Sequence, residues 1–255
     1  LIITQKVDRT DSVLGFFHEW IREFAKHCEK VTVICLQKGD YSLSANVRIL
    51  SLGKENGNFR IMRLLRLYKY VWQERRNYDS VFVHMNQVYV VLCGVFWRLL
   101  SKKITFWYAH GSVSFSLKVA EKLAHLIFTS TKDGFRLHSK KICVVGQGID
   151  TELFKPRNNI KNEFKIISVG RISPVKRFDL IIEAVNLLKN RGIFVQLDII
   201  GGGQTDDQKK YLESLEGLVK EKKLDDRVSF IGEVYHDNLP LFLQSSSLFV
   251  NASEN

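Results

Sequence analysis

The chain has few cysteines, and none of them form a Cys-x-x-Cys pair. Its 255 residues contain four, Cys28, Cys35, Cys93 and Cys143, and all four fall within predicted strands or helices. Closely spaced cysteines are typical of zinc sites and redox motifs, and disulfides belong to oxidising compartments. We therefore interpret the four as reduced core residues of a cytosolic protein and expect no metal site.

Apolar runs long enough to span a bilayer are also absent. The run from Val88 to Trp97 is broken by Arg98 and predicts a buried crossover helix. There is no internal repeat, low-complexity segment or signal peptide in view, although the chain begins at Leu1, so a few residues or a leader could be absent. With 45% apolar and 25% charged residues, the chain can bury two ordinary cores.

The segment from Ile166 to Lys176, IISVGRISPVK, is the most informative part of the chain. Its β-branched residues predict a buried strand that ends at Gly170, where a side chain would crowd an approaching ligand. Arg171 and Lys176 then lie at the carboxyl end of a strand beside a helix N-terminus, which is where open α/β sheets bind anionic ligands. The pattern favours a diphosphate site; two solvated surface cations are the alternative.

The remaining segments extend this pattern. Ser173 and Pro174 predict the start of a helix that ends near Gly192. Further short strands follow, each ending in small or polar residues, as in half of a doubly wound nucleotide-binding domain. They are Val195–Ile200 before Gly201–Gly203, Val228–Ile231 before Gly232, and Leu248–Val250 before Asn251–Glu254.

The segments VGRISPVKRFDLIIEAV, LDIIGGG, VSFIGEV and LFVNASEN, in this order and spacing, resemble the donor-binding half of retaining glycosyltransferases of family 4, which have the GT-B fold. Upstream, KICVVGQGIDTELFKP resembles the segment that leads from their first domain into their second. The resemblance implies an α/β protein with two doubly wound Rossmann-like domains facing across a cleft, the second incomplete. Residues 1–158 would be the acceptor-side domain, residues 159–255 the donor-binding domain, and residues 158–161 the linker.

The same resemblance implies roles for residues of the second domain. Gly170, Arg171, Lys176 and Gly202 would bind the nucleotide diphosphate, with Arg171 and Lys176 also catalytic, and Val234 would contact the base. Glu254 matches the first of a pair of glutamates that lie near the transferred sugar and the ribose. The second would fall beyond Asn255, so we expect the chain to be a fragment that is inactive by itself.

Two residues of the first domain are also implied. His110, after a predicted strand and before Gly111, would contact the transferred sugar and help to orient the transition state. Gly15 would let backbone amides approach the diphosphate or the acceptor, although most relatives have two glycines there. His84 also ends a predicted strand, and we interpret it as structural. The expected strands are Leu1–Thr4, Val31–Leu36, Val47–Leu50, Ser80–His84, Ile104–Tyr108, Leu126–Ser130 and Ile142–Val145.

The implied reaction transfers a sugar, with retention, from a nucleotide diphosphate sugar to a hydroxyl of a saccharide or lipid-linked acceptor in cell-surface polysaccharide or glycolipid synthesis. No cofactor or metal is expected, since a fixed guanidinium and ammonium can stabilise the leaving diphosphate and no Asp-x-Asp motif is present. A GT-B nucleotide-sugar epimerase and a noncatalytic nucleotide-sugar-binding scaffold are the alternatives.

The positive charge is concentrated in the first domain. Residues 1–160 contain 25 Lys and Arg against 13 Asp and Glu, a net charge of +12, whereas residues 161–255 contain 13 against 14, a net charge of −1. No nucleic-acid-binding signature is present. A helix over residues 60–76 would place Arg63, Arg66 and Lys69 on one face, which suits peripheral binding to an anionic membrane surface on the cytoplasmic side. Its other face, Ile61, Leu64, Leu65, Tyr68, Val71 and Trp72, is expected to pack in the core, and an ordinary core helix is the alternative.

Overall fold

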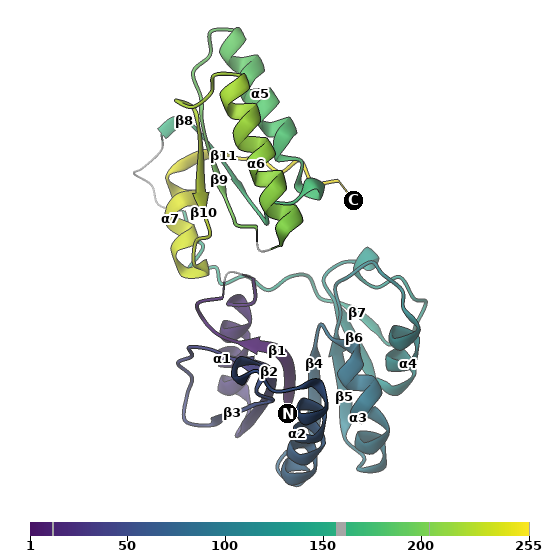
Figure 1. Ribbon diagram of the computed structural model, residues 1–255. Coiled ribbons are helices and arrows are strands. Elements are labelled where there is room, and N and C mark those ends of the chain that lie inside the picture. Colours follow the sequence, from purple (N-terminus) through teal and green to yellow (C-terminus); the bar gives the residue numbers. More distant parts are fainter. Residues whose placement is uncertain (12, 157–161, 204, 255) are drawn as a thin grey trace. The chain divides into compact units, whose positions relative to one another are not determined.

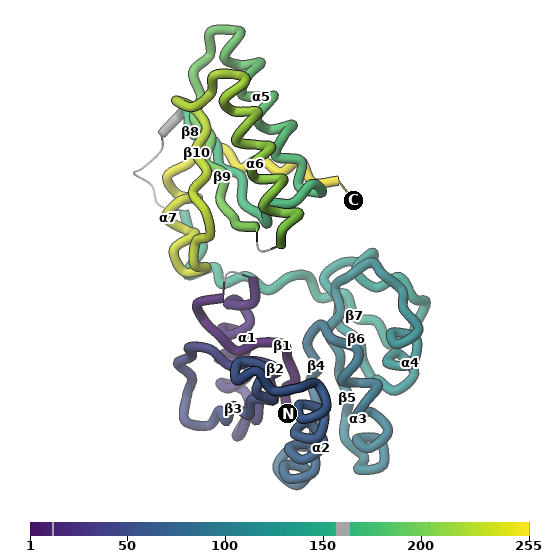
Figure 2. The backbone as a smooth tube through the Cα atoms, viewed as in Figure 1, coloured from purple at the N-terminus to yellow at the C-terminus, as the bar shows by residue number. Residues whose placement is uncertain are grey.

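The computed structural model describes residues 1–11, 13–156, 162–203 and 205–254. The chain forms two compact units, Leu1–Gly148 and Ile149–Asn255 (Figures 1 and 2). The linker expected at residues 158–161, and with it the domain boundary at 158/159, lies outside the described residues. That boundary stays a proposal.

The first unit is built on a parallel sheet of seven strands in the order β3-β2-β1-β4-β5-β6-β7. All seven strands expected from the sequence are present, and the largest differences are that β1 and β2 each run a few residues longer. Their bounds are β1 Ile2–Val7, β2 Val31–Lys38, β3 Val47–Ser51, β4 Ser80–His84, β5 Lys103–Trp107, β6 Leu126–Thr129 and β7 Ile142–Val144.

Helices cover the two faces of this sheet unequally. Ile3, Val83 and Phe106 point to one face, where they pack in a single core with residues of α2, α3 and α4. Ile2 and Val33 point to the other face, where they pack with Phe17 and Ile21 of α1. The helix bounds are α1 Phe16–His27, α2 Arg60–Glu74, α3 Gln87–Leu99 and α4 Phe115–Leu123, with short 3₁₀ turns η1 Lys54–Asn56 and η2 Lys132–Gly134.

The expected orientation of α2 is wrong. Leu67, Val71 and Glu74 are its buried residues, whereas most of the face expected in the core is exposed to solvent, with Leu65 at 59% and Trp72 at 55%. Arg63 and Arg66, expected on the outer face, are half-buried, and Arg66 donates to the carbonyl of Leu52 at 3.4 Å. Both sides of this helix carry large apolar residues, and long arginine stems can lie along a core surface, so periodicity alone did not select the correct side.

Two other expectations need correction. Only Cys35 and Cys93 are core residues, because Cys28, which follows α1, is exposed and Cys143 is half-buried. Helix α3 buries Val90, Cys93 and Trp97 as predicted, but it leaves its opposite side open to solvent. Among the described residues, no helix combines the length and apolar character needed to cross a membrane.

The second unit has a parallel four-stranded sheet in the order β10-β9-β8-β11. Its core joins Leu197 and Ile199 of β9 to residues of α5 and α6, including Phe178, Ile182 and Leu215. The bounds are β8 Asn162–Val169, α5 Phe178–Asn190, β9 Gln196–Ile200, α6 Asp206–Glu221, β10 Val228–Gly232, α7 Leu239–Gln244 and β11 Ser246–Phe249, with 3₁₀ turns η3 Pro174–Lys176 and η4 His236–Asn238.

The start of α5 differs from the prediction. Pro174 opens a separate 3₁₀ turn, η3, and Arg177 then adopts a left-handed conformation, φ 48°, before α5 begins at Phe178. A positive φ at a residue with a side chain interrupts the helix, which is why Ser173 and Pro174 do not start it. The predicted end is confirmed: Gly192 has φ 76°, and its N–H donates to the carbonyl of Lys189 at 2.9 Å.

Gly201 fixes how closely the ends of β8 and β9 approach. A Cβ atom at this position would lie 1.8 Å from the carbonyl oxygen of Gly170, and Gly201 has φ 146°. The N–H of Gly170 in turn donates to the carbonyl of Ile200 at 2.9 Å, so the two loops are bonded together. Only glycine satisfies both the contact and the backbone conformation.

We expect Gly201→Ala to lower the free energy of unfolding by at least about 2 kcal/mol, because the backbone must move to accept the methyl group. Gly217 in the interior of α6 is the matched control, since a Cβ there meets nothing within 4 Å. Gly217→Ala should raise stability by about 0.5 to 1 kcal/mol through helix propensity. Urea unfolding of both variants tests this, and equal stabilities would contradict the close contact.

Candidate functional site

Four loops of the second unit meet at one edge of its sheet. Because all four strands are parallel, residues after β8, β9, β10 and β11 leave the sheet at the same edge. Backbone hydrogen bonds connect three of these loops: Ile172 N–H donates to Gly202 at 3.0 Å, and Gly201 N–H donates to Gly232 at 2.9 Å. The sequence-predicted residues Gly170, Arg171, Lys176, Gly202, Val234 and Glu254 all lie in these loops.

Arg171 and Lys176 are the cations of the loop after β8. Arg171 is exposed, and Lys176 is half-buried with its aliphatic stem beside Gly170, where a Cβ would lie 3.4 Å from Lys176 Cε. Within the part of the chain that the structure describes, neither side chain has a hydrogen-bond or ion-pair partner. Two unpaired cations on one loop can therefore both bind an incoming anion.

Arg177 is a third cation of this loop, and sequence reasoning did not identify it. Its guanidinium donates to both carboxylate oxygens of Asp179 at 3.1–3.2 Å and forms an ion pair with Glu254. Tyr211 also donates to Asp179, at 2.9 Å. Burial opposes the ionisation of Asp179, but the hydrogen bonds from Arg177 and Tyr211 outweigh it and hold its pKa below the ordinary value. Arg177 is thus already neutralised by carboxylates.

Glu254 reaches the same loop from the end of β11. Its backbone N–H donates to the carbonyl of Val175 at 3.0 Å, which fixes the strand end against η3. Its carboxylate pairs with Arg177, while Arg171 and Lys176 remain available for a ligand.

The signal that could have identified Arg177 is its place directly after Lys176, in the same short turn.

Gly202 and Val234 have a different environment. A Cβ on Gly202 would lie 2.4 Å from the Glu233 carboxylate, so this acidic side chain covers the glycine. The N-terminus of α6 beyond the glycines is capped by Thr205 and Gln208, which exchange hydrogen bonds at 3.3 Å. Arg171 and Lys176 supply the positive charge of this edge, so a phosphate fits beside them. Val234, half-buried directly after Glu233, borders the same edge.

His110 in the first unit is exposed at the carboxyl edge of that unit's sheet. The N–H of Ser112 donates to its Nδ1 at 3.1 Å, and its own backbone N–H donates to Gly134 at 2.9 Å. Since Nδ1 accepts a hydrogen bond, the neutral ring carries its proton on Nε2. His110 therefore presents a hydrogen-bond donor to solvent from a fixed loop.

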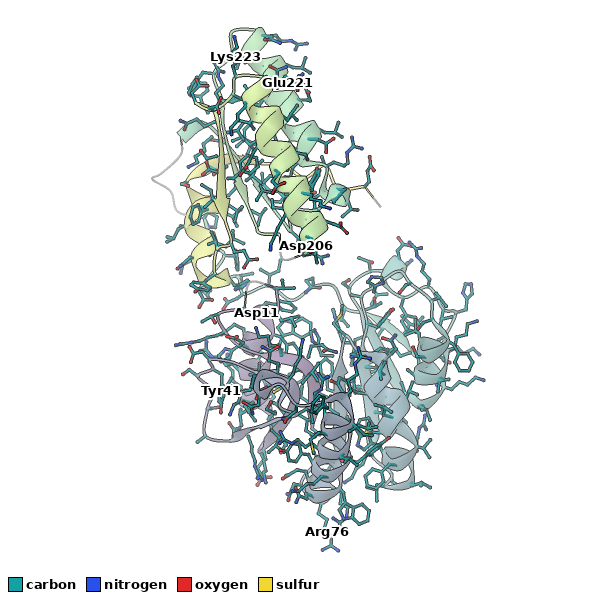
Figure 3. All side chains as sticks on the ribbon, in the orientation of Figure 1. Asp11, Tyr41, Arg76, Asp206, Glu221 and Lys223 are labelled. Carbon is teal, nitrogen blue, oxygen red and sulfur yellow. The ribbon has the colours of Figure 1, made fainter. Side chains whose placement is uncertain are left out.

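Gly15 has a steric role in its own loop. Its N–H donates to the carbonyl of Asp11 at 3.0 Å, and a Cβ on Gly15 would lie 2.5 Å from that oxygen. The side chain of Asp11, labelled in Figure 3, also accepts the N–H groups of Val13 and Leu14 at 2.9 and 2.7 Å. These amides are bonded within the loop, so the structure explains this glycine without a ligand. Its role toward a ligand stays a proposal.

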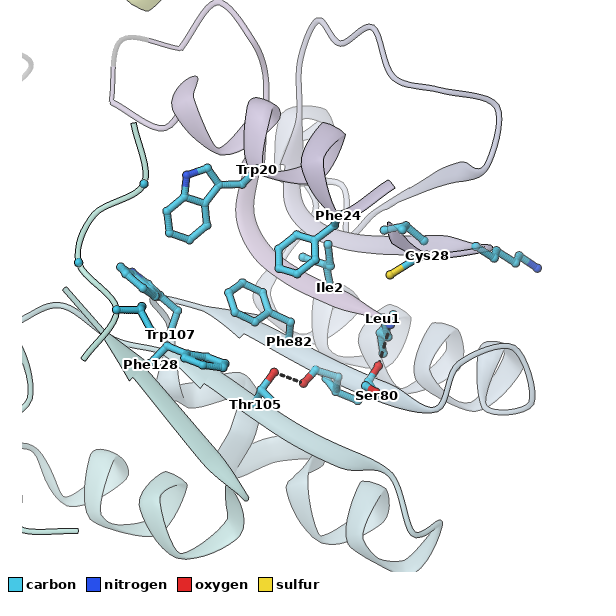
Figure 4. Close-up of a pocket in the computed structure, with 16 residues that line it drawn as sticks. Leu1, Ile2, Trp20, Phe24, Cys28, Ser80, Phe82, Thr105, Trp107 and Phe128 are labelled. Carbon is cyan, nitrogen blue, oxygen red and sulfur yellow. Dashed lines mark hydrogen bonds between the residues drawn. The ribbon is translucent and has the colours of Figure 1, made fainter. Parts of the chain in front are cut away.

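A groove of about 570 Å³ lies on the α1 side of the first unit's sheet (Figure 4). Aromatic side chains dominate it: Trp20 and Phe24 of α1 face Phe82, Trp107 and Phe128 of the strands. Such a lining does not suit a diphosphate. Among the residues that the structure describes, no three His, Cys, Asp or Glu side chains are grouped so that they could hold a metal ion.

A family model described as "Glycosyl transferases group 1" matches residues 150–255. This match covers the whole edge with Arg171, Lys176 and Glu254. The second unit belongs to the glycosyl transferases group 1 family.

Two curated proteins are similar to part of the chain. Mannosylfructose-phosphate synthase of Agrobacterium fabrum is 29% identical over 133 residues, which are 48% of this chain and 29% of that protein. The amylovoran biosynthesis glycosyltransferase AmsK of Erwinia amylovora is 28% identical over 114 residues, 44% of this chain and 26% of that protein. The matched stretches thus span less than a third of these relatives' lengths.

Solved structures share the fold. Anabaena HepE in complex with UDP matches with a TM-score of 0.71 at 16% identity. The match covers all of this chain and 74% of the HepE chain. A glycosyltransferase of Rickettsia africae has a TM-score of 0.70 at 14% identity over 99% of this chain and 73% of its own. At these identities the similarity shows the fold alone, which is the GT-B fold expected from the sequence.

His84 ends β4 inside the core of this glycosyltransferase-like fold. Its side chain is 1% exposed, its ring stacks on Phe17 with centroids 3.9 Å apart, and Thr4 Oγ1 lies 3.3 Å from Nδ1. Its Nε2 atom is buried with no partner among the described residues. Burial disfavours the charged imidazolium and lowers the pKa of His84 to about 3.

This burial predicts an acid-sensitive first unit. The unfolded chain binds a proton at His84 below about pH 6.5, and the folded chain does not until about pH 3, so stability is present at neutral pH and is lost as pH falls between these values. From pH 7 to 5, this one group should lower the free energy of unfolding by about 2 kcal/mol. His84→Gln should flatten the dependence measured by denaturant titration. His27→Gln, at a side chain that is 75% exposed, should not. A slope unchanged by His84→Gln would contradict the assignment.

Proposed function

We propose that this chain forms the main part of a retaining, metal-independent glycosyltransferase. It would move a sugar, of the hexose class, from a nucleotide diphosphate sugar to a hydroxyl of a saccharide or lipid-linked acceptor. The proposal rests on Arg171 and Lys176, two cations that have no partner among the described residues. They lie in the family-matched unit, on a loop that also contacts Glu254.

The two cations act on the leaving group. As the bond from the anomeric carbon to the diphosphate breaks, negative charge grows on the diphosphate oxygens. A fixed guanidinium donates two parallel hydrogen bonds to such oxygens and an ammonium adds a compact charge, both set in place before the reaction. Gly170 leaves room for the phosphate to approach, since the Lys176 stem is the nearest side chain beside it.

Glu254 and His110 are proposed to handle the sugar. Arg177 forms an ion pair with Glu254 and so holds its carboxylate at the strand end, where its oxygens can accept hydrogen bonds from sugar hydroxyls. The Nε2 donor of His110 would bind a hydroxyl of the transferred sugar and help to orient it. Val234 and Gly202 are proposed to border the base and the diphosphate.

The comparisons suggest what to test first. HepE structures are described in complex with UDP and with UDP-glucose, which supports uridine nucleotides as donors. AmsK acts in amylovoran biosynthesis and WaaB is a lipopolysaccharide outer core galactosyltransferase, which supports an acceptor of cell-surface polysaccharide or glycolipid type. We also propose a cytoplasmic location with peripheral contact to an anionic membrane surface through residues 60–76.

Removing either cation should affect binding and transfer together. Arg171→Ala or Lys176→Ala should lower sugar transfer by the full-length enzyme about 100-fold or more, the scale seen when one preorganised charge stabiliser is lost. Each should also weaken binding of UDP to the chain in calorimetric titrations. A panel of labelled nucleotide sugars separates transfer from epimerisation and from binding without turnover.

Arg191→Ala is the matched control, because this exposed arginine follows α5 at the opposite end of the helix. It should leave UDP affinity and transfer unchanged. Folding should survive all three substitutions, since neither Arg171 nor Lys176 bonds to another described side chain. Near-normal turnover by the Arg171→Ala/Lys176→Ala double variant would contradict the diphosphate assignment.

His110→Ala should lower kcat for transfer more than it weakens binding of free UDP, because its proposed contact is with the sugar. His138→Ala, another exposed histidine of the same unit, is the control and should change neither. Calorimetry with UDP and steady-state kinetics with the full-length protein provide the two measurements. An equal loss of kcat and UDP affinity would instead assign His110 a structural role.

A further inference from the structure

Helix α2 exposes a continuous apolar stripe. Ile61, Leu65, Tyr68 and Trp72 follow one another at helical spacing and are 70%, 59%, 43% and 55% exposed. The opposite side of α2 packs in the core through Leu67 and Val71, so the helix is firmly docked and its orientation is fixed. The exposure of the stripe is therefore a feature of the folded unit.

Helix α3 exposes a second stripe beside the first. Val88, Val95 and Leu99 are 43%, 59% and 79% exposed, and the other side of α3 is buried. The Trp72 ring lies 5.7 Å from the Phe96 ring, and Tyr68 Oη donates to the carbonyl of Leu92 at 3.3 Å, so the two helices are neighbours, as Figure 1 shows. Together, the four exposed α2 residues and these three α3 residues form the α2–α3 patch.

Every exposed charged side chain on α2 and α3 is basic. Lys69 and Arg76 are exposed on α2 and at its end, and the Arg75 guanidinium lies 4.1 Å from the centre of the Trp72 ring. Figure 3 shows Arg76 projecting from the end of this helix. The only acid on either helix, Glu74, is buried and paired with Arg48 at 2.9 Å. A patch with an apolar centre and a basic border fits a surface with an apolar interior and anionic groups.

We propose that the α2–α3 patch inserts into the interface of an anionic lipid bilayer. Self-association of two patches is disfavoured because it would bring Lys69, Arg75 and Arg76 of both copies close together. The proposal gives the membrane partner of the proposed function a defined surface on two helices. The residues that would contact the bilayer are the exposed ones, and the half-buried Arg63 and Arg66 are not among them. It stands on the first unit alone, so it can fail while sugar transfer holds, and the reverse.

Flotation with vesicles of equal phosphatidylglycerol and phosphatidylcholine tests the proposal on the full chain. Leu65→Glu/Val95→Glu should weaken vesicle binding at least about 10-fold. Arg75→Glu/Arg76→Glu should weaken it as much, since each basic residue contributes about 1 kcal/mol at such a surface. The remaining binding of this second variant should depend less on salt concentration. The controls are Leu187→Glu, also 59% exposed, and Lys209→Glu/Lys210→Glu on α6. Both controls should bind like the original chain.

A second readout uses the tryptophan emission of the original chain and needs only one conservative variant. Trp72 is 55% exposed, whereas Trp20 is half-buried and Trp97 and Trp107 are buried. Quenching of tryptophan emission by brominated phosphatidylglycerol should therefore be strong and should fall sharply in Trp72→Phe. Absence of binding by the original chain, equal binding by Leu65→Glu/Val95→Glu and Leu187→Glu, or quenching that persists in Trp72→Phe would each overturn the proposal. A vesicle-independent dimer that Leu65→Glu/Val95→Glu dissociates would replace it with self-association.

Discussion

The contact between Gly201 and the Gly170 carbonyl organises the functional edge of the second unit. It allows the loops after β8 and β9 to lie against each other, at a distance that no side chain at position 201 permits. The hydrogen bonds from Gly170 to Ile200 and from Ile172 to Gly202 depend on this approach. Arg171 and Lys176 belong to the loop after β8, so this close approach also determines the direction in which they leave the sheet.

Charge is partitioned within that loop. Arg177 is committed to Asp179 and Glu254, and these bonds connect α5, α6 through Tyr211, and the end of β11. The side chains of Arg171 and Lys176 have no such partners among the described residues. One cation thus connects neighbouring elements, while two remain for an anion.

Most of the fold could be predicted from the sequence, since short apolar runs marked the strands of both sheets and those of the second unit precede small or polar residues. The location of Arg171, Lys176 and Glu254 on one edge followed from the parallel order of those strands. The facing of α2 did not follow, because both of its sides are apolar and tertiary packing selected Leu67 and Val71. The role of Arg177 depends on a left-handed backbone and on Glu254, which is distant in sequence. The tight packing around Gly15 depends on how its loop turns back onto the Asp11 carbonyl, and the sequence pattern shows neither.

We propose above that a nucleoside diphosphate binds the loop edge of the second unit through Arg171 and Lys176. Hydrogen–deuterium exchange of the chain with and without saturating UDP measures this most directly, since ligand contact slows the opening of the loops that it touches. We expect slower exchange in residues 170–177, 201–203 and 251–254, and unchanged exchange at residues 190–193 on the opposite edge. Unchanged exchange in all three loops, or protection confined to the aromatic groove of the first unit, would contradict it.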